Sequence, residues 1–278
     1  MSRFSGKVIA ITGAASGIGR ATAVKLAGHQ VALSLCDVSD EGLRETERLC
    51  RAAGASVRSA RLDVSDHAAV NAWAEDTHDA FGGVNAIINN AGVSLSGAVG
   101  DLTLDDFEWI MGINFWGVVH GTRAFLPYLR ASGDGHIVNI SSLFGIIAMP
   151  GASAYNASKF AVRGFTESLS EELRLERAPV RVTCVHPGGI DTNIVAGGRV
   201  TPSESLGFET VDQAARDFKR LARTSPEAAA ARIVRAMTRG RRRQLIGTDA
   251  WLLEKMQRLA PVAYQNLMVS FARRSARR

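Results

Sequence analysis

The chain has 278 residues, 46% of them hydrophobic and 22% charged, and a formal net charge of +6. This length and composition favour a folded α/β protein over a disordered one, and no apolar run is long enough to predict a membrane-spanning helix. Three cysteines without a CxxC spacing, six separate histidines and an N-terminus without an apolar signal segment predict a cytoplasmic protein with reduced thiols and no metal site.

The first six apolar runs alternate with helical segments along the chain. The runs are KVIAIT, QVALSLC, SVRSARL, VNAIIN, GHIVNIS and VRVTCVH. RRRQLIG, after the helical stretch PEAAAARIVRAMTRG, supplies a seventh run. Strands buried on both faces need helices on both sides, and βαβ connections are right-handed. The pattern predicts an α/β fold with a doubly wound parallel sheet.

A glycine-rich loop, TGAASGIG, leads from the first run into a helix. Gly13 permits a tight turn, Gly17 lets the backbone approach a pyrophosphate, and Gly19 allows close packing of helix and strand. The spacing differs from GxGxxG, so an ordinary strand-to-helix turn is the alternative. Asp37 follows Gly17 by twenty residues, where a carboxylate binds ribose hydroxyls and repels a 2′-phosphate. Unless this aspartate merely caps a helix, the site prefers NAD to NADP.

Small and polar residues end the third and fourth runs. Asp63 and Val64 end the third, where the acid is placed to meet an adenine amino group. NNAG, residues 89–92, ends the fourth, and its small residues let the backbone approach a flat ligand, although a plain turn explains these letters equally well.

The stretch YNASK places Tyr155 and Lys159 four positions apart in a predicted helix. Positions i and i+4 share one helix face, so the phenol and the ammonium can point into the same space. A free phenol has a pKa of about 10, and a nearby cation favours the phenolate. The pair is therefore a candidate for acid–base chemistry. By contrast, His186, before Pro187, is interpreted as a structural strand-end residue.

The end of the chain carries most of the positive charge. Residues 239–278 hold ten Lys and Arg against Asp249 and Glu254, so the remainder is slightly negative. A nucleic-acid enzyme more often spreads its basic residues along a groove, so no nucleic-acid partner is expected. Residues from about 193 to 225 show no strand pattern and predict a mobile substrate lid.

The last thirty residues have an apolar stripe at helical spacing that Pro261 interrupts. An amphipathic tail flanked by arginines can lie on an anionic bilayer, dock on a partner or cover the substrate cleft. Packing on its own domain or on a dimer mate is the simplest interpretation. We expect residues 1–248 to form the catalytic domain and residues 249–278 to form a basic amphipathic extension.

With TGAASGIG, NNAG, Ser142, YNASK and HPGGIDT in this order, residues 4 to 248 resemble the short-chain dehydrogenase/reductase superfamily. The resemblance implies a Rossmann-like seven-stranded sheet ordered 3-2-1-4-5-6-7 and a nicotinamide cofactor at the switch point. It also implies a homodimer or homotetramer, paired through the helices that follow NNAG and carry YxxxK.

By that resemblance, Tyr155 is the general acid/base and Lys159 its electrostatic activator and a ribose ligand. Ser142 holds the substrate oxygen, and Asn114 anchors a proton-relay water. Ser142 precedes Tyr155 by thirteen residues, as in the family, whereas Ser141 should face the other side of its strand. Asparagine is a poor helix former, so Asn114 either bends the predicted helix DDFEWIMGINFWGVVHG to bind water or is a tolerated interior residue.

The resemblance also assigns the remaining contacts, among them the Ile190 backbone and the Thr192 hydroxyl on the nicotinamide carboxamide. The expected cofactor-binding residues are Gly13, Ser16, Gly17, Ile18, Gly19, Asp37, Asp63, Val64, Asn90, Ala91, Gly92, Tyr155, Lys159, Pro187, Gly188, Ile190 and Thr192. The expected substrate-binding residues are Ser142, Phe144, Tyr155 and Gly189, with Ser94, Leu95 and Ile146 nearby. Their balance suggests an apolar substrate.

These features predict an NAD(H)-dependent oxidoreductase that transfers a hydride between nicotinamide and an apolar secondary alcohol or ketone. One alternative is an NADP-dependent carbonyl reductase, in which Arg20 or a residue after Asp37 accommodates the phosphate. Another is a non-catalytic dinucleotide-binding sensor or scaffold, against which the complete catalytic set argues.

Overall fold

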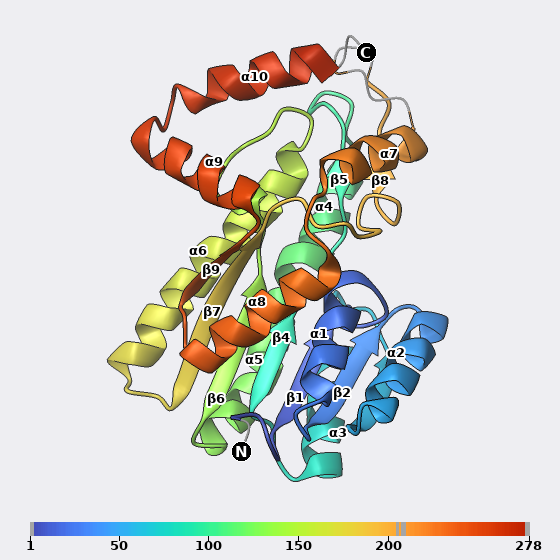
Figure 1. Cartoon of the computed structure of the whole chain (residues 1–278), viewed down its shortest axis with the longest axis vertical. Helices are drawn as coiled ribbons and strands as arrows, with labels where there is room; N and C mark the ends of the chain where they lie inside the picture. Colours follow the sequence, from blue (N-terminus) through green and yellow to red (C-terminus); the bar gives the residue numbers. More distant parts are fainter. Residues whose placement is uncertain (1–2, 204–205, 207–209, 276–278) are drawn as a thin grey trace.

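A seven-stranded parallel sheet forms the centre of the computed structural model, which describes residues 3–203, 206 and 210–275 (Figure 1). The strands are β1 Val8–Thr12, β2 Ala32–Asp37, β3 Ser56–Arg61, β4 Ala86–Asn89, β6 Gly135–Ile140, β7 Val180–Pro187 and β9 Arg243–Ile246. They lie in the order β3-β2-β1-β4-β6-β7-β9. Counted along the chain within this sheet, that is the order 3-2-1-4-5-6-7, so the predicted doubly wound, Rossmann-like fold is confirmed.

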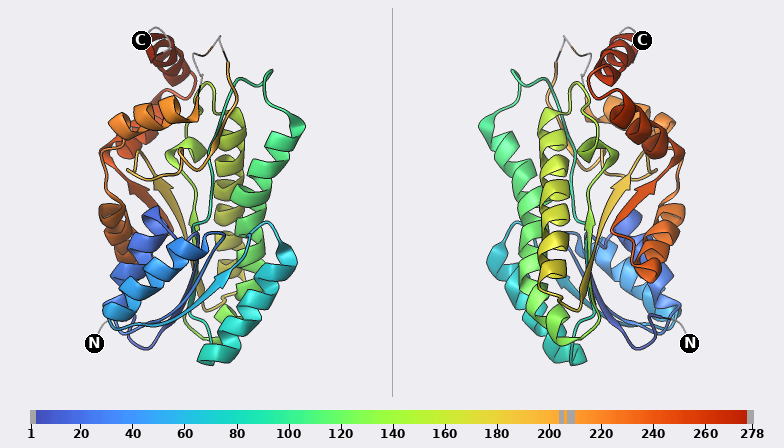
Figure 2. Two further views of the ribbon diagram at one scale, coloured as in Figure 1. Left: turned by 90° about the vertical axis from the view of Figure 1, so that its right-hand side faces the viewer. Right: turned by 90° about the vertical axis from the view of Figure 1, so that its left-hand side faces the viewer.

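Helices cover both faces of the sheet, as the two side views in Figure 2 show. α1, α2 and α8 lie on one face, and α3, α5 and α6 lie on the other. Their bounds are α1 Gly17–Ala27, α2 Asp40–Ala52, α3 His67–Phe81, α5 Gly117–Ala131, α6 Ser153–Leu175 and α8 Pro226–Arg239. The start of α8 shows how local sequence sets a boundary: Ser225 Oγ accepts the Ala228 N–H (3.2 Å), and Pro226 opens the first turn.

The central strands separate two hydrophobic cores. In β1, Ile9 and Ile11 belong to the core under α1 and α8, whereas Val8 and Ala10 belong to the core under α3 and α5. Successive strand residues point to opposite faces, and each fully buried aliphatic side chain contributes about 1.5 to 3 kcal/mol. β3 differs, because it is an edge strand and most of its side chains are exposed.

The expected lid contains a strand that its sequence did not predict. β8 (Arg199–Val200) pairs in parallel with β5 (Leu95–Ser96), and helix α7 (Val211–Leu221) follows. Two residues are too few for an alternating pattern to be visible. Part of the lid, residues 204–205 and 207–209, lies outside the described residues, and the mobility of the lid stays a prediction.

The helix predicted around Asn114 is interrupted by a π-helical turn. α4 (Leu104–Met111) leads into the turn η1 (Gly112–Trp116), which continues directly into α5. A π turn widens the helix by one residue and occurs frequently at functional sites. Asn114 lies at the centre of this turn.

Two helices follow the last strand and form the upper end of the molecule in Figure 1. α9 (Thr248–Leu259) and α10 (Tyr264–Ser275) are separated by a short turn that contains Pro261. Residues 276–278 of the predicted extension lie outside the described residues. Across the described ranges, no helix is long and apolar enough to cross a membrane.

One face of α10 packs on the loop after β6. The apolar cluster there contains Leu143, Ile146, Ile147, Ala250, Tyr264 and Met268. The Tyr264 hydroxyl also accepts the Ala148 N–H (3.1 Å). Ile146, which the sequence placed near the substrate, is instead buried in this cluster. The C-terminal helices therefore pack on their own domain, which was the simplest of the interpretations considered.

Candidate active site

The carboxyl ends of the central parallel strands meet at one edge of the sheet, and most of the predicted site residues lie there. Thr12 ends β1, Asn89 ends β4, Ile140 ends β6 and Pro187 ends β7. The strand order reverses between β1 and β4, which is where an open α/β sheet forms a crevice. The fold thus brings the glycine loop, NNAG, Ser142 and the Pro187 segment to a common edge.

Glycine is required at all three positions of the loop that the sequence argument singled out. Gly13 has φ of +65°, and a Cβ there would lie 2.7 Å from Ala91 Cα. A Cβ on Gly19 would lie 2.1 Å from the Gly13 oxygen. Gly17 has φ of +51° and opens α1, where a Cβ would lie 3.2 Å from Thr192 Cγ2. The glycines therefore let the loop pack closely against the segments around Ala91 and Thr192 and lead directly into the N-terminus of α1.

Thr12 and Asn90 hold the glycine loop against NNAG. Thr12 Oγ1 accepts the N–H groups of Asn90 and Ala91 (both 2.9 Å). Asn90 Nδ2 donates to the carbonyl oxygens of Thr12 and Gly13 (both 3.0 Å). The side chain of Asn90, expected to bind cofactor, is thus committed to shaping the loop. Sequence reasoning missed this role of Thr12, whose partners lie 78 residues away.

Asp37 lies beside the glycine loop at the end of β2. Its carboxylate accepts the N–H of Ala15 (2.9 Å) and that of Ser39 (3.1 Å). The guanidinium of Arg20 donates to the Ala15 carbonyl oxygen and to Thr46 Oγ1 (3.0 Å). The Arg20 side chain, a candidate ligand for a 2′-phosphate, therefore contacts the glycine loop and α2 instead.

The third strand supplies an exposed acid at the same edge. Asp63 accepts hydrogen bonds from the N–H and the hydroxyl of Ser65 (2.9 and 2.8 Å), while Val64 is buried. The Val64 carbonyl oxygen lies 3.0 Å from His120 Nδ1, which therefore donates to it. Contact of Asp63 with an adenine stays a prediction.

Tyr155 and Lys159 point into the same space from one turn of α6. The Lys159 Nζ lies 5.7 Å from the centre of the Tyr155 ring and donates to the Ile140 carbonyl oxygen (3.2 Å). Lys159 is 3% exposed, so its charge acts in a medium that screens it weakly.

Burial changes the acidity of both groups. Burial raises the pKa of Tyr155, and the nearby Ser142 hydroxyl lowers that pKa in part. Burial also lowers the pKa of Lys159 to about 8. The phenol is thus protonated at neutral pH, which is the form that donates a proton. The stabilisation of the phenolate by Lys159 stays a prediction.

The two serines after β6 face opposite sides, as expected from strand geometry. Ser141 Oγ is buried and donates to the Lys159 carbonyl oxygen (2.8 Å). Ser142 Oγ accepts the Phe144 N–H (3.1 Å) and caps the turn η2 (Leu143–Gly145). The Phe144 ring meets the Tyr155 ring edge-on, with centroids 6.0 Å apart. Ser142 and Phe144 therefore both lie beside the phenol.

Asn114 is fully buried and joins the loop after NNAG to α6. Its Oδ1 accepts the Val93 N–H (2.8 Å), and its Nδ2 donates to the Val93 carbonyl oxygen (3.0 Å) and to Ser158 Oγ (3.1 Å). A Cβ on Gly92 would lie 3.1 Å from Asn114 Oδ1 and 3.3 Å from Lys159 Nζ. Of the two interpretations, the local π turn favours a specific role, while the bound water stays a prediction.

The segment after β7 is held by an aspartate that the sequence argument counted only as charge. A Cβ on Gly188 would lie 2.2 Å from Asp249 Oδ2, and the Gly189 N–H donates to that oxygen (2.7 Å). The Gly189 N–H is thus committed to α9 and not to a substrate. Asp249 lies 60 residues further along the chain, so only its place in a helix start was visible in the sequence.

The backbone N–H and C=O of Ile190 take no part in the two hydrogen bonds that join its segment to Thr224. The Asp191 N–H donates to the Thr224 carbonyl oxygen (2.9 Å), and the Thr224 N–H donates to Gly189 (3.3 Å). A parallel bridge of this type leaves the N–H and C=O of the central residue pointing to the other side. With Thr192 beside Gly17, this segment borders the glycine loop.

Comparison with known proteins agrees with this arrangement. The family model for short chain dehydrogenase matches residues 7–201. "Putative oxidoreductase SadH" of Mycobacterium tuberculosis (strain ATCC 25618 / H37Rv) is 49% identical over 272 residues, which cover 97% of this chain and 96% of that protein. Levodione reductase of Leifsonia aquatica is 36% identical over 220 residues, covering 78% of this chain and 80% of that enzyme.

A solved structure of the same kind matches nearly the whole chain. The crystal structure of a short chain dehydrogenase/reductase from Burkholderia phymatum in complex with NAD has a TM-score of 0.85 and 35% sequence identity. The match covers 93% of this chain and 95% of that chain. The ordered motifs, the sheet and these relatives together show that the chain belongs to the short-chain dehydrogenase/reductase family and is an oxidoreductase that acts on CH–OH groups with a nicotinamide dinucleotide.

Proposed function

We propose that this enzyme uses NAD(H) to interconvert apolar secondary alcohols and ketones, with Tyr155 as the general acid/base. The observation that carries the proposal is the position of the Tyr155 phenol. The Tyr155 side chain is partly buried, the Ser142 hydroxyl lowers its pKa in part, and the Lys159 ammonium lies 5.7 Å from its ring centre, at the edge of the sheet where the glycine loop ends. Such a group is placed to move a proton to or from a substrate oxygen.

The residues at this edge fit a dinucleotide. The glycine loop has no side chain where a pyrophosphate would approach, and α1 points its N-terminus at that position. The Asp37 carboxylate is fixed near the loop by the N–H of Ala15, where it can accept hydrogen bonds from ribose hydroxyls. Lys159 and the Ile190 and Thr192 segment would hold the ribose and the nicotinamide carboxamide.

Side chains of the protein transfer the proton in the proposed reaction. In ketone reduction, the hydride that adds to the carbonyl carbon would come from a dihydronicotinamide held at this edge of the sheet. Ser142 donates a hydrogen bond to the carbonyl oxygen, and Tyr155 gives that oxygen its proton, so an alcohol forms. Lys159 stabilises the resulting phenolate, which then regains a proton from solvent by way of the water that we assign to Asn114. Alcohol oxidation is the reverse, with the phenolate as base.

The surroundings of the phenol favour an apolar substrate. The Phe144 ring covers one side of Tyr155. On another side, the ring packs on an apolar cluster that contains Val93, Leu95, Leu102, Phe107, Trp109, Ile110 and Ala154. Arg199 of the predicted lid contacts this cluster. Its guanidinium lies 3.9 Å from the centre of the Trp109 ring and pairs with Asp106 (3.3 Å).

Two charged residues favour NAD over NADP. The Asp37 carboxylate would lie next to a 2′-phosphate and repel it. Arg20 is the cation considered for that phosphate, but it donates to the loop carbonyl of Ala15 and to Thr46. Both observations support the proposed preference.

We expect the purified protein to reduce apolar ketones or to oxidise the matching secondary alcohols, and to bind NADH at least ten times more tightly than NADPH, because a charge clash of about 1.4 kcal/mol is tenfold in affinity. A panel of aliphatic, alicyclic and steroid-like compounds, followed by nicotinamide absorbance, measures turnover. Fluorescence titration with each cofactor measures affinity. Asp37→Asn should reduce the difference in affinity between NADH and NADPH.

Different results would favour the two alternatives. Tighter binding of NADPH would overturn the role of Asp37 and identify an NADP-dependent carbonyl reductase. Tight cofactor binding without turnover across the panel would indicate a dinucleotide-binding sensor or scaffold. Arg130→Gln is a suitable control, because this exposed arginine pairs with Glu176 far from the site.

The proposed assembly is a homodimer or homotetramer paired through α5 and α6. Trp116 of η1 and Phe160 of α6 are 51% and 40% exposed. A second copy would cover them. We also infer a cytoplasmic location, because the buried thiols of Cys36, Cys50 and Cys184 are reduced.

The outer face of the C-terminal helices combines apolar and basic side chains, and we propose that it contacts anionic membranes. Trp251, Leu252 and Leu259 are 57%, 61% and 86% exposed. The exposed Lys255 lies three residues after Leu252 and four before Leu259, so it shares their helix face. Exposed apolar residues of α10 and the preceding turn are Val262, Leu267 and Phe271. Apolar insertion with basic neighbours is the pattern of an interfacial helix.

We expect the full-length protein to sediment with vesicles that contain phosphatidylserine, and to bind less tightly at high salt, since part of the attraction is electrostatic. The variant Trp251→Glu/Leu252→Glu/Leu259→Glu should lose binding and keep its activity, because these side chains face solvent. Neutral phosphatidylcholine vesicles are the control. If the variant changes the oligomeric mass in analytical ultracentrifugation and no vesicle binding occurs, the face is a subunit interface.

A further inference from the structure

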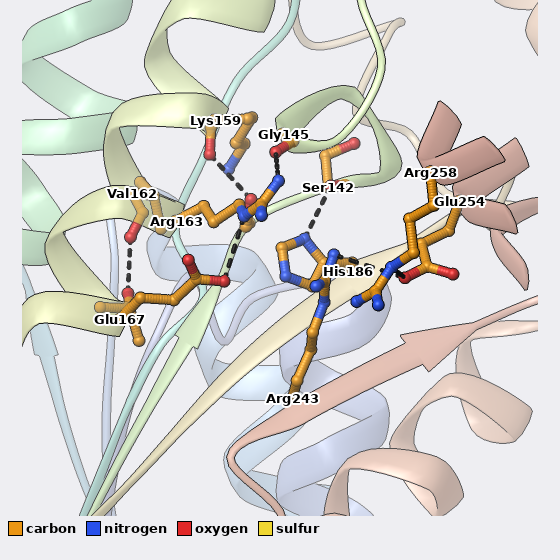
Figure 3. A network of polar contacts seen from close by, with 12 residues as sticks. Ser142, Gly145, Lys159, Val162, Arg163, Glu167, His186, Arg243, Glu254 and Arg258 are labelled. Carbon is orange, nitrogen blue, oxygen red and sulfur yellow. Dashed lines mark hydrogen bonds and ion pairs between the residues drawn. The ribbon is translucent and has the colours of Figure 1, made fainter. Parts of the chain in front are cut away.

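His186 lies next to the backbone of Ser142 (Figure 3). It is the second-last residue of β7 and is completely buried. The ring Nδ1 lies 3.0 Å from the Ser142 carbonyl oxygen. One residue further, Pro187 begins the segment that leads to Ile190 and Thr192. His186 is thus positioned between the groups assigned to the substrate oxygen and those assigned to the nicotinamide.

The contact with Ser142 defines the protonation of the ring. A carbonyl oxygen only accepts hydrogen bonds, so Nδ1 must carry the proton. Burial lowers the pKa of His186 to about 4, and the positive charges of Arg243 and Arg163 act in the same direction. The hydrogen bond to Ser142 acts in the opposite direction but does not offset them. At neutral pH the ring is therefore a neutral Nδ1–H donor.

Charged side chains behind the ring keep it in this state. Arg243 on β9 faces Glu254 of α9 at 4.0 Å, and Glu254 also pairs with Arg258. Arg163 on α6 pairs with Glu167 (3.1 Å). Figure 3 shows these side chains grouped around His186. Helix α9 thus contributes Glu254 to the charged side chains around His186.

Packing alone does not require a histidine at this position. His186 Nε2 is buried and, among the described residues, has no hydrogen-bond partner. A buried polar atom without a partner costs about 1 to 3 kcal/mol, and an apolar side chain of similar shape would avoid that cost. The Nδ1–H bond is what a histidine adds here.

The loop that carries Ser142 is held at two further points. Arg163 donates to the Gly145 carbonyl oxygen (3.4 Å). Ser141 Oγ donates to the Lys159 carbonyl oxygen (2.8 Å), which joins the loop to the catalytic helix. Neither contact is made by Ser142 itself, because they involve Ser141 and Gly145. Among the side chains that the structure describes, the His186 ring bonds directly to the Ser142 carbonyl oxygen, which also accepts the Gly145 N–H (3.0 Å).

We propose that His186 is a positioning residue: its Nδ1–H fixes the Ser142 backbone and thereby sets the distance from the serine hydroxyl to the substrate oxygen and to Tyr155. The inference rests on the proposed function, because it assigns the oxygen to Ser142. It concerns placement only, so His186 does not contact substrate or cofactor. A displacement of about 1 Å in a reacting group typically costs about a hundredfold in rate.

We expect His186→Leu to lower kcat by about 10- to 100-fold, with the cofactor dissociation constant unchanged, since the serine is displaced and the glycine loop is not. His186→Asn should keep most of the activity, because the Asn amide N–H can take the place of Nδ1–H. In a Ser142→Ala background, His186→Leu should add less than about threefold, because residues that act as a unit are not additive. Steady-state kinetics and cofactor titration measure all three.

His136→Leu is the matched control. This second buried histidine is on β6 at the opposite end of the sheet, where it contacts Thr183 (2.8 Å), and burial lowers its pKa to about 4 as well. We expect it to lower stability while leaving kcat within about threefold of the original value. Wild-type kcat in His186→Leu, equal losses in the Leu and Asn variants, or multiplying losses with Ser142→Ala would each overturn the inference.

A spectroscopic readout separates this inference from the proposed function. In nitrogen-15 NMR of the unmodified protein at neutral pH, His186 should show a neutral ring with a slowly exchanging Nδ1–H. A protein that lacks turnover but shows this signal would defeat the proposed function and leave the hydrogen bond in place. An Nε2–H tautomer or a charged ring would overturn the inference even in an active enzyme.

Discussion

Tyr155→Phe is expected to lower kcat by about 10² to 10⁴-fold in both directions, which is the usual contribution of a positioned general acid or base. The variant keeps the ring, its edge-on contact with Phe144 and its place in the apolar cluster, and removes only the hydroxyl. Because the glycine loop and Asp37 are untouched, the dissociation constant for NADH should change by less than about twofold. Steady-state rates and fluorescence titration provide the two values.

Tyr128→Phe is the matched control for this variant. Tyr128 lies on α5, where its ring stacks on His78 with centroids 4.6 Å apart, away from the carboxyl edge of the sheet. It should behave as wild type in both assays. Turnover that survives in Tyr155→Phe at more than about a tenth of the wild-type rate would remove the phenol from the mechanism.

Lys159→Met is expected to damage both chemistry and cofactor binding. The methionine has a similar length but lacks the charge that favours the phenolate and the donor assigned to the ribose. Alcohol oxidation requires the phenolate, so its rate should fall by about a hundredfold or more near pH 7 and recover in part as the pH rises. NADH affinity should also fall, which distinguishes this variant from Tyr155→Phe. Initial rates at several pH values and cofactor titration measure these effects.

The direction of the pH effect follows from the ammonium. Burial lowers the pKa of Lys159 to about 8, so the wild-type amine is charged at pH 7 and loses its charge as the pH rises through about 8. The difference in the rate of alcohol oxidation between wild type and Lys159→Met should therefore be largest below pH 8. Lys25→Met, at an exposed site near the end of α1, should not alter the profile. A profile of Lys159→Met that coincides with wild type would exclude the charge from catalysis.

The fold could be predicted because strand and helix signals agreed along most of the chain. Every strand of the large sheet begins and ends within two residues of its predicted apolar run. Glycine positions with special geometry, such as Gly13 and Gly17, were also recognisable, since a strand end and a helix start frame them. Local sequence is sufficient where an element is long and its pattern repeats.

What the sequence did not reveal depends on contacts between distant residues. The strands β5 and β8 are only two residues each and exist because they pair across more than a hundred positions. The π turn at Asn114 and the bond between Asp249 and Gly189 likewise depend on packing that no local pattern encodes. His186 was interpreted as structural, and its neighbour Ser142 becomes evident only in three dimensions.

The most direct test of the account is an ultraviolet titration of the Tyr155 phenolate with NAD⁺ bound. The chain has three tyrosines, so subtraction of the Tyr155→Phe spectrum isolates one phenol. We predict a pKa above the ordinary value of about 10 without cofactor, a pKa clearly below it with NAD⁺, and a return upward in Lys159→Met. Two results would contradict this mechanism: a Tyr155 pKa of about 10 or above with NAD⁺ bound, or the same Tyr155 pKa in wild type and in Lys159→Met.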